Sequence, residues 1–395
     1  MTKSKCISTT EFTVTRGGFR IAGTRCASKN ANGIPVIISH GFLGNRKSVA
    51  GYAEALAAWG YTAYTFDFVG GGPKNDSDGS MTDMSVLTEK EDLLAVMDYV
   101  RQDASVNFDS LVLMGCSQGG FVSAMVAAEH PAEIKKLILF YPALCIPDDA
   151  RSGKMMFFKF DPKQMPDTVS AFLGSLKISR QYIADAMKLD AFQAIEPYDG
   201  EVLIVHGTAD RIVNFHYAER AKETFGERAQ LLPVQGADHG FKKKEDALAI
   251  EAVRQFLSGR REVLTVDVRI SKPSLVQHGL TSTLTIPFDG FAKGPYFEGV
   301  IQPGAQDVQK RRGMKCVEFC ASYALRGVDQ AGQGCTVEIQ NRTTDGVHWT
   351  PTVKTDSTEL SFLNGAPCEA VLESRKTGPI VHLYAETEGN TGNTI

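Results

Sequence analysis

Ser117 lies at the centre of the segment best suited to covalent chemistry, Gly115-Cys-Ser-Gln-Gly119. The apolar run 111–114 before it is typical of a buried strand, and the run 121–128 after it is typical of a helix. A G-x-S-x-G segment between a strand and a helix predicts a tight turn that exposes the serine Oγ at the sheet edge. A Cβ at either glycine would crowd the crossing of strand and helix. We therefore expect Ser117 to be a nucleophile.

Two later loops supply the partners that a serine nucleophile needs, a base and an acid that orients the base. The run 201–206 predicts a buried strand, and Asp210 follows at its C-terminal end, where parallel sheets present functional groups. The run 229–234 predicts the last strand of this sheet, and His239 lies in the loop after it, next to a glycine. The chain order Ser117, Asp210, His239 is one that such triads use.

Other residues compete for these roles. Asp238 adjoins His239, but neighbouring loop residues rarely point their side chains at each other, so Asp210 is the preferred acid. His206 ends a buried strand and is expected to pack there or to bind a loop, whereas His40 is expected to brace one. His239 alone combines a loop position, a flanking glycine and the expected order.

An oxyanion hole requires two backbone donors near the nucleophile. Gln118 directly follows Ser117 at the start of the predicted helix and supplies the first N–H. The run 35–39 predicts an earlier strand, and Gly41 after it allows the chain to approach the turn, so that the N–H of Phe42 becomes the second donor.

These segments together resemble the cinnamoyl (feruloyl) esterase branch of the α/β-hydrolases over roughly residues 17–258. The segments are Ser39–Gly44, Phe66–Phe68, Met84–Leu93, Gly115–Gly119, His206–Asp210 and Gly236–His239. The resemblance implies a small cap over the acyl pocket at about 143–198. It places Asp149 near a carboxylate that binds phenolic hydroxyls, with Tyr182 as a looser candidate; a solvated acid and a helix-surface tyrosine are the alternatives. The chain departs from the family at Val69-Gly-Gly-Gly-Pro73 and at Cys116.

The pattern along the chain predicts two domains, 1–260 and 261–395. Strand runs alternate with amphipathic helices from about 34 to 259, one of them over 86–100, after an opening hairpin around Gly17-Gly18. This alternation favours an α/β class with a doubly wound, mainly parallel sheet. The cap carries the apolar run Met155-Met-Phe-Phe158, which suits either a hydrophobic acyl pocket or a surface that seats the cap on the body.

The tail changes to period-two runs, which predict an antiparallel β-barrel or sandwich. We expect strands over 263–270, 280–286, 335–340, 359–363 and 380–384. The segments Gly294–Gly304, Tyr323–Arg326 and Leu360–Gly365 resemble a small family of lipocalin-like β-barrels of unsettled function. The tail is expected to bind a ligand, contact a second subunit or shape access to Ser117.

Composition limits the class of partner. The chain has 395 residues, a net charge of −4 and 43% hydrophobic residues, which gives no electrostatic reason to expect nucleic acid or an anionic membrane. No apolar run suggests a signal or a membrane span, and the eight cysteines lack metal-ligand spacing. We expect a cytoplasmic protein without metal or organic cofactor; the sequence leaves a homo-oligomer open.

The resulting hypothesis is a serine carboxylesterase that hydrolyses small esters, with hydroxycinnamoyl esters favoured by the resemblance. A peptidase or a thioesterase with the same three residues is the alternative, because a triad does not encode the leaving group. A ligand-binding or scaffold protein that acts through the tail is the alternative from another class.

Overall fold

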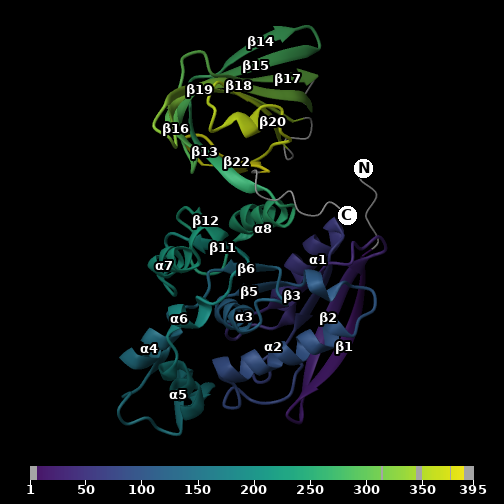
Figure 1. The fold of residues 1–395 in the computed structure, drawn as a ribbon, viewed down its shortest axis with the longest axis vertical. Helices are drawn as coiled ribbons and strands as arrows, with labels where there is room; N and C mark the ends of the chain where they lie inside the picture. Colours follow the sequence, from purple (N-terminus) through teal and green to yellow (C-terminus); the bar gives the residue numbers. More distant parts are fainter. Residues whose placement is uncertain (1–6, 313–314, 344–348, 374, 387–395) are drawn as a thin grey trace. The chain divides into compact units, whose positions relative to one another are not determined.

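The computed structural model describes residues 7–312, 315–343, 349–373 and 375–386 (Figure 1). The chain divides into two compact units, Met1–Ile250 and Glu251–Ile395. The division falls inside helix α8 (Lys243–Leu257), whereas the sequence predicts it just after this helix. No helix among the described residues is both long enough and apolar enough to cross a membrane.

The first unit is built on a mainly parallel sheet. Its strands are β1 (Ile7–Arg16), β2 (Phe19–Ser28), β3 (Pro35–Ser39), β4 (Thr62–Phe66), β5 (Val112–Cys116), β6 (Lys136–Phe140), β11 (Glu201–Gly207) and β12 (Ala229–Val234). The strand order is β1-β2-β4-β3-β5-β6-β11-β12. β1, β2 and β4 pair antiparallel, and the strands from β4 to β12 pair parallel. The central strands are fully buried, as expected when helices cover both faces of a sheet.

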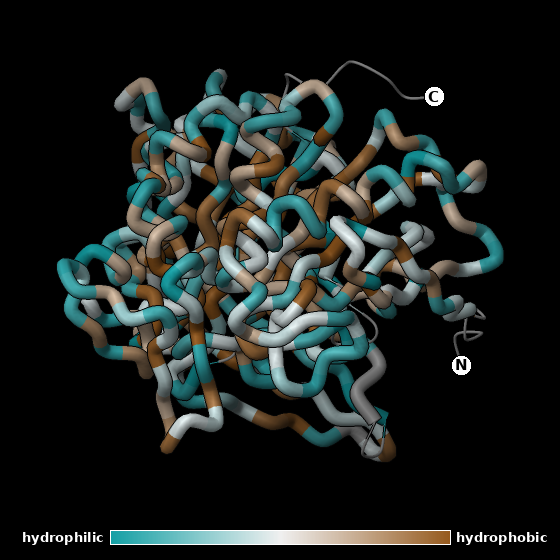
Figure 2. The backbone as a smooth tube through the Cα atoms, turned by 90° about the horizontal axis from the view of Figure 1, so that it is seen from below, coloured by the Kyte–Doolittle hydropathy of each residue, from teal (hydrophilic) through white to brown (hydrophobic). Residues whose placement is uncertain are grey.

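Helices connect these strands. They are η1 (Arg46–Val49), α1 (Ala50–Trp59), α2 (Val86–Arg101), η2 (Phe108–Ser110), α3 (Gln118–Glu129), α6 (Ala191–Ile195), α7 (His216–Phe225) and η4 (Gly226–Arg228). α2 begins where predicted because Ser85 caps it, accepting a hydrogen bond from the Thr88 N–H. α3 is almost entirely buried and packs on β5 and β6. In Figure 2, where the backbone is coloured by residue hydropathy, hydrophilic residues colour many of the outer loops.

The segment between β6 and α6, where the sequence predicts a cap, consists of short helices and hairpins. Its elements are α4 (Ile146–Ser152), β7 (Lys154–Met155), β8 (Phe158–Lys159), β9 (Thr168–Ala171), η3 (Phe172–Gly174), β10 (Leu176–Ser179) and α5 (Arg180–Lys188). β7 and β8 form one small hairpin, and β9 and β10 form a second. The Ser85 hydroxyl donates to the buried Asp185 carboxylate over 2.7 Å, which ties α5 to the start of α2.

The second unit is antiparallel. Its strands are β13 (Arg261–Ile270), β14 (Ser274–His278), β15 (Thr281–Lys293), β16 (Phe297–Ile301), β17 (Gln306–Arg312), β18 (Lys315–Asp329), β19 (Gly334–Thr343), β20 (Thr350–Thr355), β21 (Glu369–Glu373) and β22 (Ile380–Ala385). β15, β16, β18 and β17 pair in a closed cycle, which forms a small barrel. The order of paired strands in this sheet is β20-β19-β18-β16-β15-β13-β22-β21. The N–H of Ala370 in the last strand, β21, donates to the carbonyl of Trp349, which directly precedes the first strand, β20.

One strand expected in the tail is wrong. Residues 359–363 form a turn that leads into the 3₁₀ helix η5 (Ser361–Leu363). Leu360 and Leu363 are both buried. A spacing of three residues places side chains on one face of a 3₁₀ helix, so burial of this pair needs no strand.

Candidate active site

Ser117 occupies a strained turn between β5 and α3. Its φ of 53° and ψ of −120° lie outside the regions that non-glycine residues favour. The surrounding backbone holds this conformation, because the Ser117 N–H donates to Phe140 O and the Ser117 carbonyl accepts from the N–H groups of Gly120 and Ala143. A Cβ at Gly115 would lie 2.3 Å from Gly119 O, so the crossing needs a glycine there, as the sequence predicts.

The structure brings Ser117, His239 and Asp210 together from three loops. His239 Nε2 lies 3.0 Å from Ser117 Oγ, and His239 Nδ1 lies 2.7 Å from Asp210 Oδ2. With the Nδ1 proton donated to the carboxylate, Nε2 is left free to accept the serine proton. The arrangement is therefore suited to general-base activation of a hydroxyl nucleophile.

Asp210 is buried and remains an acceptor for several donors. Its Oδ1 accepts hydrogen bonds from the N–H groups of Ile212 and Val213, each over 2.8 Å. Burial alone would raise the pKa of the Asp210 carboxyl, but hydrogen bonds from His206, His239 and the Val213 backbone outweigh burial and hold this pKa well below its usual range. A carboxylate that stays charged fixes the imidazole tautomer and stabilises the imidazolium that forms during proton transfer.

The competing residues have other partners. Asp238 accepts from the side chain of Arg211, with Nε at 2.7 Å, and from the His239 backbone N–H at 2.9 Å, so it joins the two loops rather than facing the imidazole. His206 Nε2 lies 2.9 Å from Val213 O and 3.3 Å from Asp210 Oδ2. His206 thus braces the loop of Asp210, in line with the loop-binding interpretation of this residue.

The N–H groups of Phe42 and Gln118 are the predicted oxyanion donors. Neither N–H donates to another group in the described part of the chain, so both are available to a ligand. Gln118 is the first residue of α3, where N–H groups lack intrahelical acceptors. The loop of Phe42 is braced by the buried His40, whose Nδ1 bonds Gly41 O and whose Nε2 accepts from the Phe68 N–H. Burial lowers the pKa of His40, which suits a neutral bracing role.

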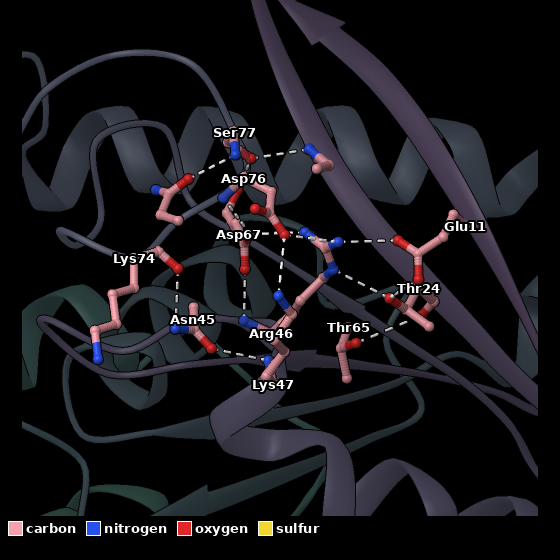
Figure 3. A network of polar contacts seen from close by, with 12 residues as sticks. Glu11, Thr24, Asn45, Arg46, Lys47, Thr65, Asp67, Lys74, Asp76 and Ser77 are labelled. Atoms are coloured by element: carbon pink, nitrogen blue, oxygen red, sulfur yellow. Dashed lines mark hydrogen bonds and ion pairs between the residues drawn. The ribbon is translucent and has the colours of Figure 1, made fainter.

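Asp67 holds this loop through Arg46 (Figure 3). Its carboxylate accepts from the Arg46 N–H over 2.5 Å and from the Arg46 guanidinium over 2.8 Å, and it also accepts from the Asp76 N–H. Arg46 extends the network to Glu11 on β1. Asp67 thus links the end of β4 to the two loops beside it, one of which carries Phe42. Sequence reasoning assigns no role to Asp67, although this residue lies in one of the segments that carry the resemblance.

Gly41 sets the distance between the Phe42 loop and the nucleophile. A Cβ at this position would lie 2.9 Å from Ser117 Cβ and 3.3 Å from Cys116 O. We expect Gly41→Ala to displace the Phe42 N–H and to lower kcat by about 10²–10³, the usual loss for one oxyanion donor. Gly51→Ala in α1 is the matched control, because nothing lies within 4 Å of its added Cβ. Equal kcat values for both variants on a chromogenic ester would contradict this role of Gly41.

An apolar pocket opens beside Ser117. Its free space, including the part open to solvent, is about 460 Å³. The lining residues are Phe42, Ser117, Gln118, Ala143, Cys145, Ile146, Asp149, Met155, Met156, Phe158, Ile178, Tyr182, Ile212 and Val213. Most of them come from the cap, Met155 and Met156 among them. Met155 is also buried in the hydrophobic core, as expected of a residue that seats the cap. Both predicted substrate-binding residues, Asp149 and Tyr182, lie in this lining. Burial raises the pKa of the half-buried Asp149 carboxyl above its ordinary value.

A buried network links the pocket to α2. The Tyr182 hydroxyl donates to Gln118 Oε1 over 2.5 Å, and Gln118 Nε2 donates to Glu89 Oε2 over 2.8 Å. Burial raises the pKa of the Glu89 carboxyl well above its ordinary range, which favours the neutral acid. Sequence reasoning missed Glu89 as a site residue; the only signal was its place in the 84–93 segment that resembles the esterases.

Tyr141 is a third residue that sequence reasoning did not indicate. Its ring packs edge-on against His239 with centroids 4.8 Å apart, and its φ is 39°.

Among the described residues, no group of three or more His, Cys, Asp or Glu side chains is arranged to hold a metal ion.

A hydrolase family described as serine aminopeptidase, S33, matches residues 32–188. No curated protein shows significant similarity to the chain. Est1E from Butyrivibrio proteoclasticus with ferulic acid bound is 28% identical, with a TM-score of 0.58 over 62% of this chain and 98% of that chain. A second structure of Est1E is 26% identical, with a TM-score of 0.55 over 63% and 97%.

A more distant structure shares the fold alone. Mouse alpha/beta hydrolase domain-containing protein 10 is 19% identical, with a TM-score of 0.52 over 63% of this chain and 98% of that chain. Taken together, the family match and the similar structures support an α/β-hydrolase fold and a serine hydrolase for the first unit.

Proposed function

We propose that this α/β-hydrolase is a serine carboxylesterase that forms an acyl-enzyme on Ser117. The observation that carries the proposal is the hydrogen-bonded series Ser117, His239 and Asp210 at the base of an apolar pocket. The backbone N–H groups of Phe42 and Gln118, for which the described residues offer no acceptor, are proposed to supply the oxyanion hole that acyl transfer requires.

The proposed reaction has two halves. Ser117 Oγ attacks the ester carbonyl while His239 Nε2 takes its proton, and Asp210 stabilises the resulting imidazolium. The N–H groups of Phe42 and Gln118 hold the oxyanion, and His239 returns the proton to the departing alkoxide. Water then attacks the acyl-enzyme with His239 again as the base, which releases the acid and restores Ser117.

Hydroxycinnamoyl esters are the proposed substrates. The pocket offers an apolar wall for the acyl chain and ring, and Asp149 supplies an acceptor that a phenolic hydroxyl can reach. Est1E, which is similar to this chain, was solved with ferulic acid bound. Tyr182 is proposed to influence substrate binding indirectly, by holding the side chain of Gln118, because its hydroxyl already donates to that side chain.

Asp149→Asn tests the phenol contact. We expect kcat/KM for methyl ferulate to fall about tenfold, the loss of roughly one charge-assisted hydrogen bond. The value for methyl cinnamate, which lacks the phenol, should change little. Asp148→Asn is the matched control, because Asp148 is exposed and is not part of the pocket lining. An equal loss on both esters would refute the phenol contact but leave the esterase proposal intact.

A peptidase is the second candidate, because the matching family is described as serine aminopeptidase. Peptides and esters share the acyl-enzyme route and differ in the leaving group. Comparison of kcat/KM on an aminoacyl anilide and on methyl ferulate distinguishes the two, and a clear preference for the anilide would replace the esterase proposal. A thioesterase is tested in the same way with an acyl thioester.

For the second unit we propose a lipocalin-like β-barrel with a ligand-binding or scaffold role. The closed strand cycle and the hydrogen bond between the ends of the strand path support this proposal. A cytoplasmic location is also proposed. Free thiols suit a reducing compartment, and the cysteines whose side chains are described, Cys26, Cys116, Cys145, Cys320, Cys335 and Cys368, are free.

A further inference from the structure

The tips of the two cap hairpins expose large apolar side chains. Met156 and Phe157 turn the β7–β8 hairpin and are 37% and 45% exposed, whereas Phe172 and Leu173 turn the β9–β10 hairpin and are 58% and fully exposed. The Phe157 and Phe172 rings contact each other edge-on at 4.9 Å, which joins the tips into one surface. These four residues are called the cap patch below.

The residue types at these tips are unusual for turns. Met156, Phe172 and Leu173 have φ values of 47°, 49° and 56°. Turns with positive φ favour glycine, asparagine or aspartate, which adopt this conformation with less strain. The cap therefore keeps large apolar side chains in water and in strained backbone at the same time. Strain and exposure that coincide at three positions indicate a function for the side chains themselves.

The charge of the cap hairpins differs in sign from that of the whole chain. Residues 154–159 and 168–179 contain Lys154, Lys159 and Lys177 and no aspartate or glutamate, whereas the chain as a whole has a net charge of −4. All three lysines are exposed. The acid nearest to β9 along the chain, Asp167, is paired with Arg180. The charged side chains of the two hairpins that carry the cap patch are thus all lysines, whereas the segment 160–167 between the hairpins carries Asp161, Lys163 and Asp167.

From this surface we infer that the cap docks on an anionic lipid–water interface. Exposed aromatic and aliphatic side chains enter the boundary between headgroups and acyl chains, and flanking lysines are attracted to anionic headgroups. Met156 belongs both to the patch and to the pocket lining, so docking would place the pocket mouth against the lipid surface. The delivery of an amphiphilic ester to Ser117 rests on the proposed function; the docking itself does not.

The test measures binding, which needs no hydrolysis. The full chain is floated with vesicles of phosphatidylglycerol or of phosphatidylcholine, at low and high salt. We expect flotation with phosphatidylglycerol that weakens at high salt, and much less with phosphatidylcholine. The double variant Phe172→Asn and Leu173→Asn should reduce the bound fraction about tenfold. Asparagine tolerates positive φ, so this variant should keep or raise the Tm while it loses binding.

Controls separate docking from the alternatives. Leu280→Asn removes an apolar side chain that is 82% exposed outside the cap, and its binding should equal that of the wild type. Loss of binding in Leu280→Asn alone, or absence of wild-type flotation, overturns the inference. The alternative partner of the cap patch is a second copy of the chain, which sedimentation velocity would detect as a dimer. If the double variant dissociates such a dimer and the wild type binds no vesicles, the inference of lipid docking is also overturned. Cleavage of a soluble ester by the double variant reports separately on the proposed function.

Discussion

Ser117→Ala is expected to lower kcat on methyl ferulate and on p-nitrophenyl butyrate by about 10⁵–10⁶, because residues that act as one unit lose nearly everything together. His239 would then have no hydroxyl to deprotonate, although its contact with Asp210 would persist. The residual rate over the uncatalysed reaction would come from binding and from the two backbone donors. Steady-state kinetics on both esters provides the measurement.

The control for this variant lies six residues further along the chain, in the helix that follows Ser117. Ser123 is fully buried in α3, and its Oγ has no hydrogen-bond partner among the described residues. Ser123→Ala should leave kcat unchanged and the fold intact. If Ser117→Ala retained activity within tenfold of Ser123→Ala, Ser117 would not be the nucleophile, and the esterase proposal would fall with it.

Asp210→Asn is expected to lower kcat by about 10⁴ while KM changes little, since asparagine keeps the volume of the side chain but favours the wrong imidazole tautomer. An amide that donates to His239 Nδ1 forces the proton onto Nε2, the atom that must accept from Ser117. The buried carboxylate is also the group that would stabilise the imidazolium, and its lowered pKa keeps it charged over the whole neutral range. Kinetics at several pH values measures the loss.

Asp238→Asn is the matched control for the acid. Asp238 lies next to His239 in sequence, but its carboxylate faces Arg211 and the backbone. Its replacement should cost less than tenfold in kcat and should loosen the pairing of the two loops. A larger loss in Asp238→Asn than in Asp210→Asn would reverse the assignment of the acid.

The sequence predicted the first unit well because local patterns determine its functional turns. A strand, a glycine-flanked serine and a helix leave little freedom for Ser117, and the loops after two buried strands place Asp210 and His239 at one sheet edge. Glu89 and Asp67 could not be found in this way. Both act through contacts between segments far apart in sequence, Glu89 with Gln118 and Asp67 with Arg46.

The tail was harder to predict for a different reason. Period-two runs indicate strands, but they do not distinguish a strand from a 3₁₀ turn that buries two leucines three residues apart, which is why 359–363 was misassigned. The net charge of −4 is an average over the chain and does not report how charge is distributed locally. The proposal of an anionic interface rests instead on Lys154, Lys159 and Lys177 in the two cap hairpins.

The reacting groups and the pocket wall come from different parts of the chain. The proposed nucleophile, base, acid and oxyanion donors come from loops and from the start of α3 at the edge of the sheet, whereas most of the pocket wall comes from one continuous insertion between β6 and α6. In the proposed esterase, substrate choice is therefore separable from bond cleavage. Exchange of the insertion for that of another hydrolase should redirect selectivity while the reaction steps stay the same, which makes the cap an interchangeable module for both evolution and engineering.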